Sequence, residues 1–308
     1  MARRPRSTLV AGFDVDSDAA RLVTLHDPGD GSVEVTDTRH AALDPSWFDS
    51  GTPTDTKAIT QVLRALVKDA GVRGKTKVHA ATANEPVILR LITPPPVPAD
   101  QLDGVLAYEI RKNLPIGEDE AEIDYELIDE GGEHRALIGA VRREHAQAMA
   151  TLLASARVSL ASLEPRPLAI MRATRPPTGD PDIVMLLNAE SATITARTPR
   201  VLIANRVSDI GTRHLDSDPD NAARALIADV SEVARTLTSS LGSEFTLTLA
   251  GTDPSDSGLG AMMRAHFDRD VRPCTFADAI ADAAPAAGID GHSPFLTAIG
   301  LAMKGLAP

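Results

Sequence analysis

Three strands, a helix and a fourth strand follow one another twice along this chain, and this repeat constrains the fold more than any other sequence feature. In the first copy, short β-rich runs bounded by aspartate and glycine predict the strands. Apolar residues at i, i+3 and i+4 spacing predict the helix. The predicted strands cover residues 7–14, 20–26, 32–42 and 76–82, and the predicted helix covers residues 57–71.

The second copy has the same order of elements, although its sequence identity to the first copy is negligible. This order is typical of a duplicated ribonuclease-H-like domain, the core shared by actin, sugar kinases and Hsp70. We therefore predict an α/β protein with an actin-like, two-lobed fold. The predicted strands of the second copy cover residues 182–188, 191–197, 200–209 and 245–250, and the predicted helix covers residues 218–241.

A third block lies between the two copies and reads as strand, helix, two strands and helix. A segment of this length is rarely structureless, so we predict an inserted α+β subdomain. The predicted domains are a first lobe of residues 1–84, the inserted subdomain of residues 85–159 and a second lobe of residues 181–308. Parts of residues 160–180 and the C-terminal helix are expected to join the first lobe.

The composition excludes several kinds of site and partner. The 308 residues include 43 acidic and 31 basic side chains, so the formal net charge is −12. Binding to a phosphate backbone needs clustered lysine and arginine, and nucleic acid is therefore not an expected partner. Cys274 is the single cysteine, which excludes an internal disulfide and a thiolate zinc site. The eight histidines lack the paired spacing of metal ligands, so no metal site is predicted.

Neither the apolar runs nor the chain ends predict insertion into a membrane. No run approaches the roughly 20 apolar residues of a membrane-spanning helix, and the basic start lacks the pattern of a signal peptide. We expect a cytoplasmic protein. The closing helix, with Ser293 as its cap and Pro294 at its first position, carries one lysine and no basic face. It is expected to pack on the core.

Four segments of the chain resemble the PilM family of type IV pilus assembly proteins, which is itself similar to the cell-division protein FtsA. The resemblance implies an actin-like molecule in which the inserted block replaces an actin subdomain. The segments are the opening hairpin GFDVDSDAARLVTL at 12–25, the stretch from VILRLITPPP to IDYELI at 87–128, ALIGAVRREH to PRPLAI at 136–170, and SPFLTAIGLAMKGL at 293–306.

The resemblance also implies a partner, the short cytoplasmic N-terminal segment of a single-pass inner-membrane pilus protein, PilN. In the family this segment lies in a groove between the first lobe and the insertion. From the residues alone, the Leu114-Pro115 pair is explained as a helix stop and Tyr125 as packed core, without a partner. The residues that the resemblance assigns to the groove are Arg90, Tyr108, Leu114, Pro115, Asp124 and Tyr125.

The first hairpin departs from the family's nucleotide pattern. Asp14 keeps the family's aspartate, and Ser17 and Arg21 are tolerable counterparts of its serine and lysine. Asp16, however, stands at the glycine position. This substitution adds a side chain where backbone must approach phosphate, and it sets a negative charge against a polyanion. A magnesium ion could offset part of this repulsion, because hard cations favour carboxylates.

The second hairpin departs further, with no glycine in the stretch LLNAESATITA. Asn188 is the nearest counterpart of the family's aspartate, and Glu190 adds another acid. Gly211 and Gly251 remain, each where a glycine pair or cluster is usual. We predict that the hairpins persist as architecture in a degenerate nucleotide pocket.

Three hypotheses follow. The first is a cytoplasmic, non-enzymatic scaffold at the inner face of the cytoplasmic membrane, which binds a PilN-like segment and other pilus components. The second is a protein that binds ATP with magnesium and so sets lobe closure. The third is an FtsA-like filament protein, which is disfavoured because no linker and amphipathic helix follow Pro308. No catalytic motif is present, and homo-oligomerisation is left open.

Overall fold

The first lobe is built on a five-stranded sheet of order β10–β6–β1–β2–β3. β1 pairs antiparallel with β2 and parallel with β6, and β10 adds in parallel beyond β6. The computed structural model describes residues 8–30, 32–49, 51–82, 87–95, 97, 99–113, 116–130, 133–176, 181–242, 244–251, 258–290 and 293–306. The strands of this sheet are β1 (Thr8–Val15), β2 (Ala19–Asp27), β3 (Glu34–Ala42), β6 (Lys77–Ala81) and β10 (Leu160–Glu164).

The second lobe repeats this sheet in the order β14–β13–β12–β15–β16. β12 pairs antiparallel with β13 and parallel with β15, as β1 does with its two neighbours. The shared order and strand directions confirm the predicted duplication, because two unrelated sheets would have no reason to match strand by strand. The strands are β12 (Asp182–Leu187), β13 (Ala192–Arg197), β14 (Leu202–Ser208), β15 (Thr246–Gly251) and β16 (Val271–Pro273).

Helices cover both sheets at corresponding places. In the first lobe, α1 (Thr56–Asp69) is capped by Asp55, whose side chain accepts from the N–H of Ala58. The predicted helix of the second lobe, residues 218–241, corresponds to α6 (Pro219–Leu241), and a shorter helix that was not predicted, α5 (Thr212–Ser217), precedes it; Asp218 ends α5 and caps α6. The apolar core under α6 is continuous from β12 to α7 (Leu259–Phe267).

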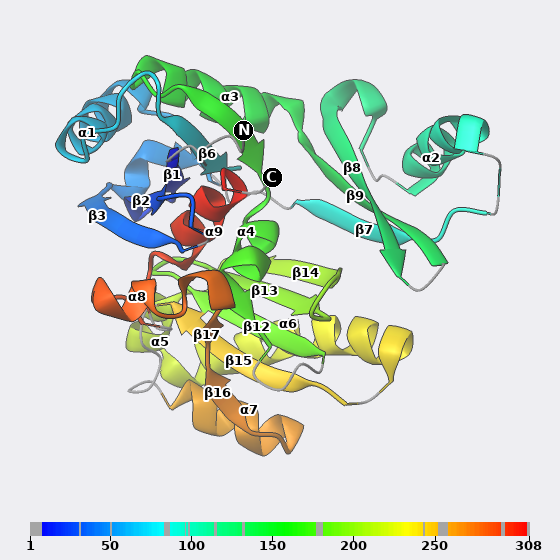
Figure 1. Ribbon diagram of the computed structural model, residues 1–308. Helices are drawn as coiled ribbons and strands as arrows, with labels where there is room; N and C mark the ends of the chain where they lie inside the picture. Colours follow the sequence, from blue (N-terminus) through cyan, green and yellow to red (C-terminus); the bar gives the residue numbers. More distant parts are fainter. Residues whose placement is uncertain are drawn as a thin grey trace.

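Two helices lie between the lobes, α4 (Arg166–Ala173) and α9 (Leu296–Lys304) (Figure 1). α9 is buried from Leu296 to Ala302 and packs against β1 and α4, which confirms the predicted docking of this segment on the core. The helix begins at Leu296 rather than at Pro294, and the hydroxyl of Ser293 accepts from the N–H of Phe295 at 3.2 Å. A Cβ at Gly300 would lie 1.8 Å from the carbonyl oxygen of Ala169, so glycine permits this close helix approach.

The inserted unit is a three-stranded antiparallel sheet of order β7–β9–β8. It projects from the two lobes with α2 beside it (Figure 1). β8 therefore forms one edge of this sheet, and β7 forms the other. The elements are β7 (Ile88–Ile92), α2 (Ala99–Asn113), β8 (Ala121–Glu130) and β9 (Glu133–Arg142).

The next helix, α3 (Arg143–Ser155), lies within the range 85–159 that was predicted for the insertion. Its buried residues Met149 and Leu152 share a core with Ile59 and Leu63 of α1. α3 also directly precedes the edge strand β10, as α7 directly precedes the edge strand β16. We therefore propose that the inserted unit comprises β7, α2, β8 and β9, and that α3 belongs to the first lobe.

Short elements complete the described chain. None of the described helices is long and apolar enough to cross a membrane. The short elements are η1 (Pro45–Trp47), β4 (Phe48–Asp49), β5 (Thr52–Pro53), η2 (Glu118–Glu120), β11 (Thr174–Arg175), β17 (Thr275–Phe276), η4 (Asp278–Ile280) and α8 (Ala283–Ala286).

Candidate functional site

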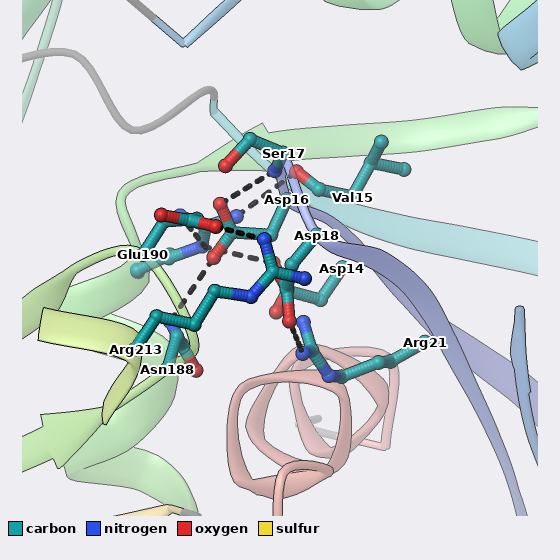
Figure 2. A network of polar contacts seen from close by, with 10 residues as sticks. Asp14, Val15, Asp16, Ser17, Asp18, Arg21, Asn188, Glu190 and Arg213 are labelled. Atoms are coloured by element: carbon teal, nitrogen blue, oxygen red, sulfur yellow. Dashed lines mark hydrogen bonds and ion pairs between the residues drawn. The ribbon is translucent and has the colours of Figure 1, made fainter. Parts of the chain in front are cut away.

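The turns of the two lobe hairpins meet where the lobes face each other. Asp16 lies in the turn between β1 and β2, and Asn188 lies in the turn between β12 and β13. The Asn188 Nδ2 group donates to Asp16 Oδ2 at 3.0 Å (Figure 2). Both residues are buried, Asp16 with 3% and Asn188 with 2% of the residue surface exposed. A direct polar contact thus joins the two lobes at the place predicted for the phosphate groups.

A buried arginine from α4 faces the first hairpin. Arg166 donates from Nε to Asp14 Oδ1 and from Nη2 to the carbonyl oxygen of Val15, each at 2.9 Å. Its Nη1 lies 3.5 Å from Asp16 Oδ2. Nη1 makes no hydrogen bond within the described part of the chain. One guanidinium therefore contacts three oxygen atoms of the first hairpin.

Burial and neighbouring charges shift the pKa values of two residues at this junction. Burial disfavours the charge of Arg166, but the carboxylates of Asp14 and Asp16 outweigh burial and hold the pKa of the guanidinium above its usual range. Burial raises the pKa of Asp18. The charge of Arg21 lowers this pKa, but the carboxylates of Asp16 and Asp14 raise it, so it stays above its usual value. Arg21 Nη2 and Asp18 Oδ2 are 2.7 Å apart.

The turns themselves are fixed by local hydrogen bonds. The Ser17 N–H donates to Asp16 Oδ1 at 2.7 Å, so this N–H is already paired with a carboxylate of its own turn. In the second turn Glu190 forms an ion pair with Arg213 of α5 (Figure 2). The N–H of Arg213 also donates to the carbonyl oxygen of Ala189 at 3.0 Å. Side chains and backbone of α5 thus hold the second turn.

The two predicted glycines pack behind the second hairpin. A Cβ at Gly211 would lie 2.4 Å from the carbonyl oxygen of Ala189. Gly251 has φ +92°, and a Cβ there would lie 2.1 Å from the carbonyl oxygen of Leu187. Each position therefore requires glycine for a close backbone approach within the second lobe.

The structure brings Asp14, Asp16 and Asn188 together. Ser17 lies in the same turn as Asp16, and Arg21 forms an ion pair with Asp18 at the end of that turn. The residue that sequence reasoning missed is Arg166, which lies 152 positions from Asp14. The sequence around it, SLEPRPLAI, carries no local pattern that links an arginine to the first hairpin. Only the placement of α4 after β10 brings them together. Among the described residues, no three histidine, cysteine or acidic side chains form a group that could hold a metal ion.

The predicted partner residues are distributed over the inserted unit. Arg90 and Tyr125 both pair with Ile138 of β9, so the three side chains share one face of the sheet. Asp124 lies on the opposite face, because successive residues of a strand alternate. Leu114 and Pro115 lie outside the described residues.

Large apolar side chains are exposed mainly on this unit. Tyr108 of α2 is 59% exposed, and Tyr125 and Leu127 of β8 are 38% and 50% exposed. Leu9 of β1 is the remaining exposed large hydrophobic residue in the described chain. A cavity of about 450 Å³ lies where β8 begins and α3 starts, and it is lined by Glu120, Arg142, Arg143, Glu144 and Gln147.

The sequence model of the family "Type IV pilus assembly protein PilM" matches residues 12–175, more than half of the chain. The chain belongs to the PilM family. Among curated proteins, no relative matches the chain at a significant level.

Two solved structures support the fold of this PilM-family chain. A chain of a PilM–PilN type IV pilus biogenesis complex is 20% identical, with a TM-score of 0.74, and the match covers 97% of this chain and 99% of that one. The ethanolamine utilization protein EutJ from Carboxydothermus hydrogenoformans is 13% identical, with a TM-score of 0.52, over 98% of this chain and 91% of that one. The predicted actin-like fold is confirmed.

Proposed function

We propose that this chain is a non-enzymatic cytoplasmic scaffold of type IV pilus assembly, which binds the cytoplasmic N-terminal segment of a PilN-like single-pass inner-membrane protein. Membership of the PilM family supports the process. The similarity of the whole chain to a component of a PilM–PilN complex supports the class of partner. The partner would hold the scaffold at the inner face of the cytoplasmic membrane, so membrane contact would be indirect.

The observation that carries the proposed binding surface is the exposure of Tyr108, Tyr125 and Leu127 on one projecting unit. Exposed aromatic side chains commonly serve as anchors in interfaces, because they bury a large area at a small cost in side-chain entropy. We place the partner segment along the outer edge of β8. An extended segment can add to a sheet edge through main-chain hydrogen bonds, with side chains adding selectivity.

The cavity at the start of β8 fits this arrangement. The cavity lies between the inserted unit and α3, which we assign to the first lobe. The family resemblance implies a partner groove between these two parts of the molecule. A segment that runs along β8 from this cavity would reach Tyr125 and then Leu127, which lie on one face at i and i+2. In this proposal the mixed charges of the cavity, among them Arg143 and Glu144, orient the segment.

The proposal further holds that the pocket between the hairpins no longer binds ATP. The carboxylate of Asp16 lies where a phosphate would approach and already contacts Asn188 and Arg166. The N–H of Ser17, a possible phosphate donor, is paired with Asp16. A phosphate chain would have to break these contacts and meet buried negative charge, so the residues present do not fit it.

Peptide binding tests the partner. A fluorescent peptide with the N-terminal cytoplasmic sequence of the PilN-like protein from the same genome is titrated with the wild-type chain, and anisotropy is recorded. We expect saturable binding that Tyr125→Ser weakens at least about tenfold, as loss of a buried anchor usually does. Leu9→Ser is the matched control, because Leu9 is also exposed but lies on β1. Absence of wild-type binding, or equal loss in both variants, would contradict the proposal.

Calorimetric titration with Mg-ATP tests the pocket separately. The wild-type chain is expected to release no binding heat. Saturable heat with about one nucleotide per chain would refute the degenerate pocket and favour the ATP-regulated alternative, while leaving the peptide proposal unaffected.

A further inference from the structure

The first hairpin forms a cradle of oxygen atoms that is filled by a side chain of the same protein. The cradle consists of Asp14 Oδ1 and the Val15 carbonyl oxygen, both 2.9 Å from the guanidinium, and Asp16 Oδ2 at 3.5 Å. Carboxylate and carbonyl oxygens are the ligands that hard divalent cations prefer. The donor set is therefore that of a cation site, and the cation in it is Arg166.

Burial makes this cation necessary. The side chains of Asp14 and Asp16 are 1% and 2% exposed, and that of Arg166 is 4% exposed. Charge on two carboxylates that are both removed from water is costly, because it loses hydration, so a positive charge in contact with both offsets that cost. The Nη1 group lies 3.5 Å from Asp16 Oδ2 and makes no hydrogen bond to any residue that the structure describes, so towards Asp16 the guanidinium supplies charge rather than a hydrogen bond.

One of these carboxylates, that of Asp16, also reaches the other lobe. Asp16 Oδ2 is shared between Arg166 of α4 and Asn188 of the second hairpin. The guanidinium thus holds Asp16 in the orientation in which it contacts the second lobe.

We propose that the guanidinium of Arg166 takes the place of a bound cation in the first hairpin. It thereby keeps Asp16 in contact with Asn188 when neither metal nor nucleotide is bound. This inference rests on the proposed loss of nucleotide binding but makes a separate claim. Once the guanidinium is removed, Asp14, Val15 and Asp16 should accept a divalent cation from solution.

The test uses thermal unfolding of the full chain with MnCl₂ or MgCl₂ and no nucleotide. Arg166→Gln should lower the unfolding temperature by roughly 10 °C, because it leaves two buried carboxylates without a counter-ion. MnCl₂ should recover most of this loss, and titration calorimetry should find about one ion per chain. The wild type and Arg166→Lys, which keep a positive charge in the cradle, should show no response to MnCl₂.

A double variant separates charge from packing. Asp16→Asn combined with Arg166→Gln removes one carboxylate together with the guanidinium, so it should be more stable than Arg166→Gln alone and insensitive to MnCl₂. If Arg166→Gln does not fold, a folded double variant supports the inference and an unfolded one overturns it. Arg166→Gln that is as stable as wild type, or that gains nothing from MnCl₂, also overturns it. Neither result depends on whether the wild type binds Mg-ATP.

Discussion

A second buried arginine shows how single residues join elements of this fold. Arg197 of β13 is 1% exposed, and its Nη1 group donates to the Thr174 carbonyl oxygen at 3.0 Å, at the end of α4. Its Nη2 group lies 3.3 Å from Asp182 Oδ2. Burial raises the pKa of Asp182, and Arg197 lowers it in part, as do hydrogen bonds from Thr248 and Thr246. The hydrogen bond from Arg197 to Thr174 ties the second sheet to the end of α4, while the ion pair lies within that sheet.

Loss of this arginine should be costly. We expect Arg197→Gln to lower the free energy of unfolding by about 3–5 kcal/mol, because removal of one partner leaves a buried charge uncompensated. Urea denaturation measures the change. Arg235→Gln is the control, since that side chain is 76% exposed and should change stability by less than about 1 kcal/mol. Equal midpoints for the two variants would show that the buried pair contributes little.

His79 of β6 should make stability depend on pH. Burial lowers the pKa of its ring, and the positive charge of Lys304 lowers it further. The unfolded chain takes up a proton below about pH 6.5, whereas the folded ring does so only at lower pH. The stability from the neutral ring is therefore complete above about pH 6.5 and is lost as pH falls from there through the lower pKa of the folded ring.

Urea denaturation of the wild type and His79→Gln between about pH 8 and pH 5 measures this dependence. The wild type should lose stability relative to His79→Gln as pH falls. His266→Gln serves as the control, because His266 of α7 is exposed. A difference between wild type and His79→Gln that stays constant with pH would contradict the assignment.

At the scale of elements, the approach of α9 to α4 and β1 determines how the lobes are joined. A Cβ at Gly12 would lie 1.8 Å from the Ala298 carbonyl oxygen, and one at Gly300 would lie equally close to that of Ala169. These are backbone contacts, so no side chain can rotate away to make room. Glu164 of β10 adds ion pairs to Arg172 of α4 and Lys304 of α9.

Two glycine-to-alanine substitutions should have opposite effects. Gly300→Ala should destabilise the chain by about 3 kcal/mol or more, at the upper end of what overpacking typically costs, because α9 must move away from α4. Gly104→Ala in α2 should stabilise by about 0.5–1 kcal/mol. Among the described residues, nothing outside the neighbouring backbone of α2 itself lies within 4 Å of the Cβ position at Gly104. Thermal unfolding compares them, and a tolerated Gly300→Ala would show that the two helices are not in this close contact.

At the scale of the whole molecule, one apolar core spans both lobes. It includes Val10 and Leu25 from the first sheet, Val184 and Leu186 from the second, and Ile299 from α9. The inserted unit contacts this body through Leu89 and Leu137, which pack against Leu202 of β14. Because the two lobes share one apolar core, unfolding of either lobe would expose apolar side chains of the other.

The lobes should therefore unfold together. Trp47 is packed against the core of the first lobe, so its fluorescence reports on that lobe alone. Far-UV circular dichroism reports on all elements. The two urea transitions should coincide, as expected for a single cooperative unit. A fluorescence transition at a lower urea concentration than the dichroism transition would show that the first lobe unfolds independently.

Local patterns determined much of what the sequence could predict. The apolar spacing of α1 predicted a helix, and the strand runs around Phe13 and Ile183 predicted both hairpins. β10, in contrast, was not predicted. It is a five-residue strand whose pairing partner, β6, is distant in sequence. The predicted helix at 218–241 was right for α6, but α5 was missed because six residues carry little periodicity.

The sequence by itself determined the order of most elements, the duplicated sheet and the acidic residues of the first turn, because alternation, helical spacing and turn composition act over a few residues. Only the tertiary structure decided that Arg166 lies against Asp14 and Asp16, that α3 packs with α1, and that Arg90 and Tyr125 share a face. Each of these depends on which distant strands pair and where the following helix then begins. A buried carboxylate requires a positive partner, but the partner's identity follows from the fold and not from the sequence around the carboxylate.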